Sequence, residues 1–150
     1  MIMNIRKCSL KSIAMIDFYL VLFYTKNGGN EMDIFCKIIN GEIPSKTIYE
    51  DDIVLVILDV NPRSNGHSLV IPKQHYKDLY DIDDKTLMHI MNVAKKIGNT
   101  LEEKLHCNGV TLEQNNGIAQ EVKHFHLHII PRYKYDDIVD VDEVYSIIKH

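Results

Sequence analysis

An α+β domain is the fold class that the sequence predicts, with an antiparallel sheet of about five strands, one long helix and one short helix. Three observations support this. Residues 83–105 carry apolar side chains at helical spacing, and several β-branched runs have the length of strands. These runs do not alternate regularly with helices, as they would in a parallel βαβ sheet.

The short helix is predicted for residues 33–39, DIFCKII. Asn40-Gly41 follows this segment and is typical of the left-handed residue that ends a helix. Pro44 prevents its continuation.

Two strands are predicted next, at 53–58 and 68–71. The first is an apolar β-branched run of the kind found in central strands. The second follows the turn at Asn65-Gly66 and stops at Pro72. Together they predict a hairpin with a long loop.

The long amphipathic helix is predicted over 83–105, with Asp83 or Asp84 as its N-cap and Asn108-Gly109 as its end. A further strand begins at 110–112, and the Asn115-Asn116-Gly117 turn leads into a strand at 122–130, VKHFHLHII. The residues after Pro131 are polar and weakly patterned, so no element is predicted there.

Composition narrows the possible partners. The chain has 150 residues, enough for one domain with a normal core, and a net charge of -4. That charge leaves no basic footprint for nucleic acid, so we expect a small-molecule partner. Three widely spaced cysteines do not form a disulfide framework and indicate a reducing compartment, so the expected location is the cytoplasm.

Residues 1–31 differ from the rest and are treated as an extension, with the domain expected at 32–150. The apolar stretch 13–25 is interrupted by Asp17 and is shorter than the about 20 residues of a bilayer span. No cleavage site of the signal-peptide kind follows it, so we expect no membrane contact. Two interpretations stay open: a real but dispensable extension, or a ribosome-binding site read through in frame, because Gly28-Gly29 stands just before Met32.

Three histidines carry the predicted chemistry. His124, His126 and His128 alternate with apolar residues, so on a strand all three would share one face. A solvated edge strand is the plainer alternative. A shared zinc is disfavoured, because the outer two would stand ~13 Å apart on a strand. Neutral imidazole is a good nucleophile and proton donor near pH 7, so this row could divide those two roles.

The run 124–132, HFHLHIIPR, fits the pattern H-φ-H-φ-H-φ-φ, in which φ is apolar, and the chain resembles the histidine triad (HIT) family from Asp33 to about Tyr135. The resemblance extends to IFCKIINGEIPS at 34–45, YEDD at 49–52, LDVNP at 58–62, GHSLVIPKQH at 66–75, and NNG with QEV before the triad. The Pro131-Arg132-Tyr133 ending is similar to the bacterial general branch of the family, related to the Hint nucleotide hydrolases.

The resemblance implies a role for each histidine. His126 would attack the α-phosphorus and carry the nucleotidyl group as a covalent intermediate, which water then hydrolyses. His128 would contact the phosphate and assist the leaving group, and His67 would support the row from the neighbouring strand. His124 completes the triad.

The resemblance also implies a nucleotide site. Asp59 matches the residue that binds ribose, although a turn aspartate at a strand end is the plainer interpretation. The matches to the apolar walls around the base, each of which could also be ordinary core, are Phe35, Ile38, Ile57 and Val60. The matches to the phosphate-contacting segment are Asn115, Gln120 and Glu121. That segment is two residues shorter here than the family pattern NNG-x-x-A-G-Q.

A zinc site is the last implied feature. Asp33, Cys36, His75 and His124 match the branch's four zinc ligands, with Asp33 in place of a cysteine. A carboxylate is a harder ligand than a thiolate, and we expect Asp33 to be poorly ordered beside Met32, so zinc should be weak or absent and no cofactor required.

The expected function is hydrolysis or transfer at the α-phosphate of nucleoside phosphoramidates or dinucleoside polyphosphates. A purine nucleotide is the expected partner, and the resemblance implies a two-fold homodimer. Two alternatives stay open: a purine-nucleotide-binding or adaptor protein with little turnover, and a zinc-containing regulatory module.

Overall fold

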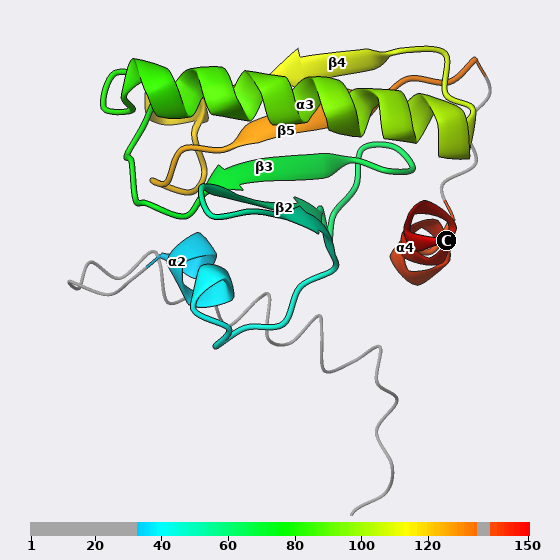
Figure 1. Cartoon of the computed structure of the whole chain (residues 1–150), viewed down its shortest axis with the longest axis horizontal. Coiled ribbons are helices and arrows are strands. Elements are labelled where there is room, and N and C mark those ends of the chain that lie inside the picture. Colours follow the sequence, from blue (N-terminus) through cyan, green and yellow to red (C-terminus); the bar gives the residue numbers. More distant parts are fainter. Residues whose placement is uncertain (1–32, 135–138) are drawn as a thin grey trace, which may run out of the picture.

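A five-stranded sheet forms the centre of the computed structural model, which describes residues 33–134 and 139–150 (Figure 1). The strand order is β1-β2-β3-β5-β4, and each neighbouring pair is antiparallel. The predicted α+β class is therefore confirmed. The strands are β1 (Thr47–Glu50), β2 (Val54–Leu58), β3 (Ser68–Pro72), β4 (Val110–Glu113) and β5 (Leu127–Pro131).

The predicted short helix is α2 (Ile34–Ile39). Asp33 is its N-cap, and the carboxylate oxygen Oδ1 accepts hydrogen bonds from the amides of Phe35 at 2.9 Å and Cys36 at 3.0 Å. Gly41 follows the helix with φ of +77°, a conformation that favours glycine. The predicted helix and its end at Asn40-Gly41 are confirmed, and the N-cap role of Asp33 is added by the structure.

The predicted hairpin is confirmed by β2 and β3, which pair from Val54↔Pro72 to Leu58↔Ser68. Gly66 ends the long loop between them with φ of +86°, and a Cβ there would lie 2.5 Å from the side chain of Leu105. Glycine is therefore required at this position both for its backbone angle and for close packing. His67 follows it, immediately before β3.

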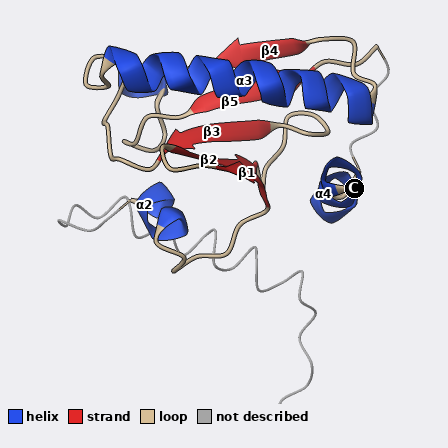
Figure 2. Cartoon of the chain, viewed as in Figure 1, coloured by secondary structure: helices blue, strands red, loops and turns tan. Residues whose placement is uncertain are grey.

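The long helix is α3 (Asp84–Leu105), with Asp83 as its N-cap. It ends at His106, whose φ of +54° is left-handed, and so stops before the predicted Asn108-Gly109. Figure 2 shows α3 lying across the sheet. The core between them includes Val56, Val70, Ile90, Leu101, Leu127 and Ile129.

The other face of the sheet packs against α2 through a smaller apolar cluster, formed by Phe35, Leu55, Ile57, Leu69 and Ile71. These strand residues alternate with those that face α3, as the two-residue period of a strand requires. The sheet thus has one face covered by α3 and a second that carries α2 and the functional side chains described below.

The strand predicted at 122–130 needs correction, because β5 begins only at Leu127. His124 and His126 precede it, and His128 is the one triad histidine within it. The backbone before β5 forms a hydrogen bond outside the sheet: the amide of Phe125 donates to the carbonyl oxygen of Tyr76 at 2.6 Å. This tertiary contact is not visible as a pattern in the sequence.

Three elements were not predicted individually: β1, the 3₁₀ turn η1 (Gly117–Ala119) and α4 (Val141–Lys149). The apolar residues Val141, Val144, Tyr145 and Ile148 of α4 recur at helical spacing behind the N-cap Asp140 and pack in the core, so this local signal was missed by reasoning from the sequence. The helix contacts α3 and β1.

The division proposed at residue 32 lies outside the described residues and stays a prediction. Within the described ranges, no helix is both long and apolar enough to cross a bilayer.

Candidate functional site

Four imidazoles gather on the α2 side of the sheet. His67 and His124 are almost fully buried, His126 is 6% exposed, and His128 is partly buried. The rings of His126 and His128 lie 4.9 Å apart, and those of His67 and His128 lie 5.2 Å apart. The structure therefore brings together the histidines grouped from the sequence, with His67 contributed from the position immediately before β3.

The protonation state of His126 follows from one hydrogen bond. Its Nδ1 lies 2.7 Å from the backbone oxygen of His124, and a carbonyl oxygen can only accept, so the proton is on Nδ1. Nε2 therefore keeps its lone pair, as a nucleophile requires. Burial lowers the pKa of His126, and the ring of Phe35 contacts it at 5.0 Å between centroids.

A chain of hydrogen bonds determines the tautomers of the other two rings. The amide of Arg63 donates to Nδ1 of His67 at 3.1 Å, so the proton of His67 is on Nε2. That nitrogen lies 2.9 Å from Nδ1 of His128 and donates to it. The proton of neutral His128 is therefore on Nε2, available to a bound ligand.

Both rings are neutral near pH 7. Burial lowers the pKa of His67 to about 4, and the positive charge of Arg63 acts in the same direction. Burial also lowers the pKa of His128 to about 4, with further contributions from His126, His67 and Arg63. The site therefore offers an imidazole lone pair on one ring and an imidazole N–H on the next.

Asp59 follows β2 beside these rings, and its carboxylate Oδ2 lies 3.7 Å from Nε2 of His67. Its Oδ1 accepts from the amide of Asn61 at 2.8 Å. Burial raises the pKa of Asp59, while that hydrogen bond and the charge of Arg63 oppose the rise. The carboxylate thus keeps acceptor capacity close to the histidines.

The residues expected to form the base walls separate into two groups. Phe35 and Ile57 are buried in one apolar cluster, and Ile38 packs against it. Val60 lies outside that cluster and is 59% exposed. An apolar wall therefore forms at the α2 side of the histidines without Val60.

The expected phosphate-contacting segment is ordered in spite of its short length. Lys123 Nζ binds the carbonyl oxygens of Gly117 at 2.6 Å and Gln120 at 3.2 Å, and so closes the loop around η1. Gln120 is buried and donates to the carbonyl of Lys77 at 2.6 Å. Glu121 is exposed at the surface.

Asn115 forms a side-chain hydrogen bond with Glu113. Its Nδ2 donates to Glu113 Oε1 at 3.0 Å. The same carboxylate accepts two hydrogen bonds from the guanidinium of Arg63, at 2.8 and 2.9 Å. Arg63 and Glu113 were missed by reasoning from the sequence, since the only signal was that Arg63 precedes His67 by four residues.

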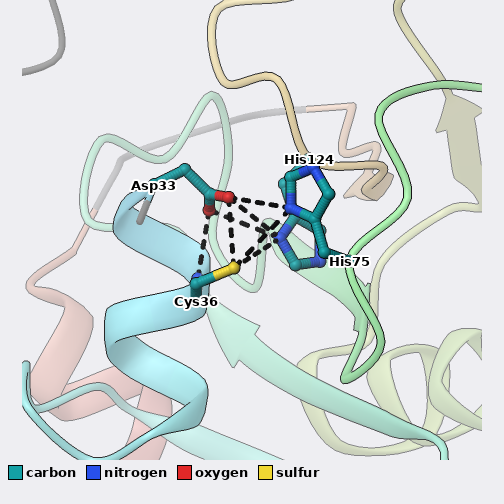
Figure 3. Close-up of side chains that lie close together, drawn as sticks. All are labelled: Asp33, Cys36, His75 and His124. Atoms are coloured by element: carbon teal, nitrogen blue, oxygen red, sulfur yellow. Dashed lines mark hydrogen bonds and ion pairs between the residues drawn. The ribbon is translucent and has the colours of Figure 1, made fainter. Parts of the chain in front are cut away.

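A second cluster joins α2 to the triad (Figure 3). Asp33, Cys36, His75 and His124 each direct one ligand-type atom to a common point. Cys36 Sγ lies 3.2 Å from Asp33 Oδ2, 3.6 Å from His75 Nδ1 and 3.5 Å from His124 Nδ1.

These separations fit a tetrahedral zinc ion. Ligands at about 2.0–2.3 Å from a tetrahedral metal lie about 3.3–3.7 Å from one another. Three spacings agree, at 3.4–3.6 Å. Asp33 Oδ2 lies closer than this to Cys36 Sγ, at 3.2 Å, and to His75 Nδ1, at 3.0 Å. His124 Nε2 donates to the carbonyl of Pro72 at 2.8 Å, so in the neutral ring Nδ1 presents its lone pair to the cluster.

The expectation that Asp33 would be poorly ordered was wrong, because its Oδ1 caps α2 while Oδ2 faces the cluster. Burial raises the pKa of Asp33, but its contacts with His124 and with the amide and thiol of Cys36 outweigh burial and hold that pKa well below its usual value. Burial and the hydrogen bond to Asp33 raise the pKa of the Cys36 thiol to about 11.

Comparison with known proteins agrees with this geometry. Residues 40–135 match the HIT domain. The chain is 47% identical over 129 residues to an uncharacterized HIT-like protein of Methanocaldococcus jannaschii, covering 79% of this chain and 99% of that protein. It is 44% identical to an adenosine 5'-monophosphoramidase of Saccharomyces cerevisiae, over 66% of this chain and 61% of the yeast protein. It is 43% identical to an adenylylsulfatase of Arabidopsis thaliana, over 69% of this chain and 53% of the plant protein.

Among solved structures, a zinc-bound histidine triad family protein from Mycobacterium smegmatis superimposes with a TM-score of 0.72 at 37% identity. The match covers 77% of this chain and 89% of the mycobacterial one. The arrangement of sheet and helices is thus shared with a relative that holds zinc.

Proposed function

The chain belongs to the HIT family, and we propose that it hydrolyses adenosine 5'-phosphoramidates and related nucleotides at the α-phosphorus through a covalent intermediate on His126. The observation that carries this proposal is the Nδ1–H hydrogen bond from His126 to the backbone oxygen of His124, since it leaves Nε2 free to attack. The yeast and plant relatives, named for action on adenylyl compounds, support the substrate class.

In the first step, the Nε2 lone pair of His126 forms a bond to the α-phosphorus and the bond to the leaving atom breaks. The Nε2–H of His128 donates a hydrogen bond to that atom, and the leaving amine takes up a proton from solvent, so His128 stays neutral. His126 becomes a positively charged phosphoimidazolium when its Nε2 bonds to phosphorus. The amine departs with the proton from solvent, and the nucleotidyl group stays on His126.

In the second step, water attacks the same phosphorus and the bond to His126 breaks. His126 leaves as a neutral imidazole, the proton that the water loses passes to solvent and replaces the one taken up in the first step, and the nucleoside monophosphate is released. The neutral tautomers of His67 and His128 suit this cycle, because the amide of Arg63 orients His67 and His67 orients the Nε2–H of His128 before any ligand binds.

A site for the nucleoside is proposed beside the histidines. We propose that the base lies against Phe35, Ile38 and Ile57, with Asp59 accepting from the ribose hydroxyls and Asn115 near the phosphate. A charged carboxylate accepts strong hydrogen bonds, so Asp59 would favour ribonucleotides. Gln120 would contribute by holding the short loop to Lys77.

Zinc is proposed as a structural group at Asp33, Cys36, His75 and His124, because their spacing fits a tetrahedral ion. When bound, zinc supplies a cross-link between α2 and the segment before β5. Those residues would thereby keep Phe35 against His126. A carboxylate in place of a second thiolate should make the site weaker than one with two cysteines.

Rapid mixing with α-³²P-labelled adenosine 5'-phosphoramidate tests the proposed reaction. We expect release of labelled AMP and, after an alkaline denaturing quench that preserves phosphohistidine, a label on the protein in the first turnover. Nucleotide binding without either signal would instead favour the alternative of a binding or adaptor protein.

A further inference from the structure

A bidentate ion pair lies at the edge of the histidine site. Both terminal nitrogens of Arg63 bind the two carboxylate oxygens of Glu113, at 2.8 and 2.9 Å. The side chains are 45% and 34% exposed, so a ligand or solvent can reach both groups. Ion pairs at such exposure are weak enough for a bound anion to rearrange.

The Arg63–Glu113 pair lies next to the catalytic histidines in two ways. Glu113 is directly opposite His128 in the pairing of β4 with β5, so both side chains project from the same face of the sheet. The amide of Arg63 donates to His67, which in turn donates to His128. One ion pair therefore adjoins the proton donor from two sides.

The pair also lies on the side of His128 away from the nucleoside wall. Across the sheet, Ile57 is opposite Leu69, Leu69 is opposite His128, and His128 is opposite Glu113. The apolar wall with Phe35 is on the β2 and β3 side of this row. If the nucleoside occupies that wall and the phosphorus lies at His126, the leaving group points toward β4 and the ion pair.

The charge of Arg63 reaches the reacting groups, since it contributes to lowering the pKa of both His67 and His128. Glu113 opposes this effect at the same two rings. The balance between these two side chains therefore determines the local charge that a departing group meets.

We infer that the Arg63–Glu113 pair sets the leaving-group preference of the site, favouring amines over sulfate or phosphate. This inference rests on the proposed hydrolysis at the α-phosphorus. An amine can donate its N–H to Glu113, whereas an anionic leaving group meets a carboxylate and must compete with it for Arg63. Glu113 acts chiefly by binding the guanidinium of Arg63. Arg63 is the group to which an anionic leaving group would bind if Glu113 released it.

Paired substrates provide the test, because adenosine 5'-phosphoramidate and adenosine 5'-phosphosulfate share the nucleoside and the α-phosphate. The measured quantity is the ratio of kcat/KM for the sulfate to kcat/KM for the amine compound. Any loss of folding or nucleoside binding affects both substrates and cancels in the ratio. The full chain is used as wild type, Glu113→Gln, Arg63→Met, the double variant and Glu50→Gln.

Glu113→Gln should raise this ratio about three- to tenfold, because it releases Arg63 for the anion. Arg63→Met should lower it, and the double variant should behave like Arg63→Met, since Glu113 acts through the guanidinium. Glu50→Gln is the matched control: Glu50 forms an ion pair with Lys73 at 2.8 Å and should leave the ratio unchanged.

The outcomes separate the two proposals. A wild-type protein that cleaves neither compound would refute the proposed hydrolysis, and this inference with it. A wild-type protein that cleaves at least one, with a ratio unmoved by Glu113→Gln and Arg63→Met, would overturn the role of the ion pair alone. Equal shifts in the Glu50→Gln control would also overturn it, because the effect would then be one of net charge.

Discussion

Nδ1 of His126 donates a 2.7 Å hydrogen bond to the backbone oxygen of His124, and this contact determines which nitrogen of His126 can react. It joins two alternate histidines of one segment, so the segment that supplies the nucleophile also orients it. Such an orientation does not depend on any other side chain. The first prediction follows directly from it.

His126→Ala should abolish turnover and the covalent label while nucleotide affinity stays within roughly tenfold, because the lost group acts mainly in bond formation. Turnover and equilibrium binding of AMP measure the two effects separately. His150→Ala, at the exposed C-terminal residue, is the matched control and should be unaffected. Turnover by the His126→Ala protein would disprove the assignment of the nucleophile.

Asp59→Ala should weaken binding of AMP by ~1–3 kcal/mol, through loss of charge-assisted hydrogen bonds to the ribose. Binding of the 2',3'-dideoxy analogue should change much less, because it has no hydroxyls to donate. Calorimetric titration of both ligands measures this difference. Equal losses for the two would remove Asp59 from the sugar site.

The sequence alone led us to expect weak or absent zinc, but Asp33 is held in place as the cap of α2 and faces the other three ligands. Protein purified without added zinc should therefore retain the metal through dialysis and lose it when Cys36 is replaced by Ser. Cys107→Ala, at a cysteine that packs against the main core, is the control and should keep its zinc. Asp33→Cys should tighten binding against a competing chelator, because thiolate is the softer ligand. Metal analysis of the four proteins decides the matter, and metal-free wild type would refute the zinc site.

Stability should fall as the pH is lowered from about 6.5 to about 4. The folded-state pKa values of His67 and His128 are lowered to about 4, so in this window the unfolded chain binds more protons than the folded one. Each histidine contributes a slope of up to about 1.4 kcal/mol per pH unit. Carboxylates with lowered pKa, such as Glu113, stay ionised through most of this range.

Urea unfolding at a series of pH values measures this slope. His67→Gln should flatten it by removing one of the two groups, and His150→Ala should not. An equally steep slope in the His67→Gln protein would show that other groups cause the loss of stability.

A chain that starts at Met32 should fold and act as well as the full chain, if residues 1–31 are an extension of the domain. A chain that starts at Ile38 provides the contrast, since it lacks the metal-cluster residues Asp33 and Cys36 together with Phe35 and should lose zinc and nucleotide affinity. Thermal melts and binding of AMP compare the three. Loss of solubility on truncation to Met32 would show that the earlier segment belongs to the domain.

The sequence by itself determined the elements whose signals are local. Asn40-Gly41 marked the end of the helix predicted at 33–39, and the β-branched run 53–58 with its partner at 68–71 predicted the central hairpin. The histidine spacing identified the residues that gather in the site. These predictions succeeded because caps, turns and periodic apolar residues act on neighbours in the chain.

Only the tertiary structure decided the features that depend on contacts between distant segments. It placed His124 and His126 before β5, bonded the amide of Phe125 to the carbonyl of Tyr76, and joined Arg63 to Glu113 across 50 residues of chain. The physical reason is that burial and long-range hydrogen bonds depend on which surfaces meet, and no local pattern in the sequence encodes that choice.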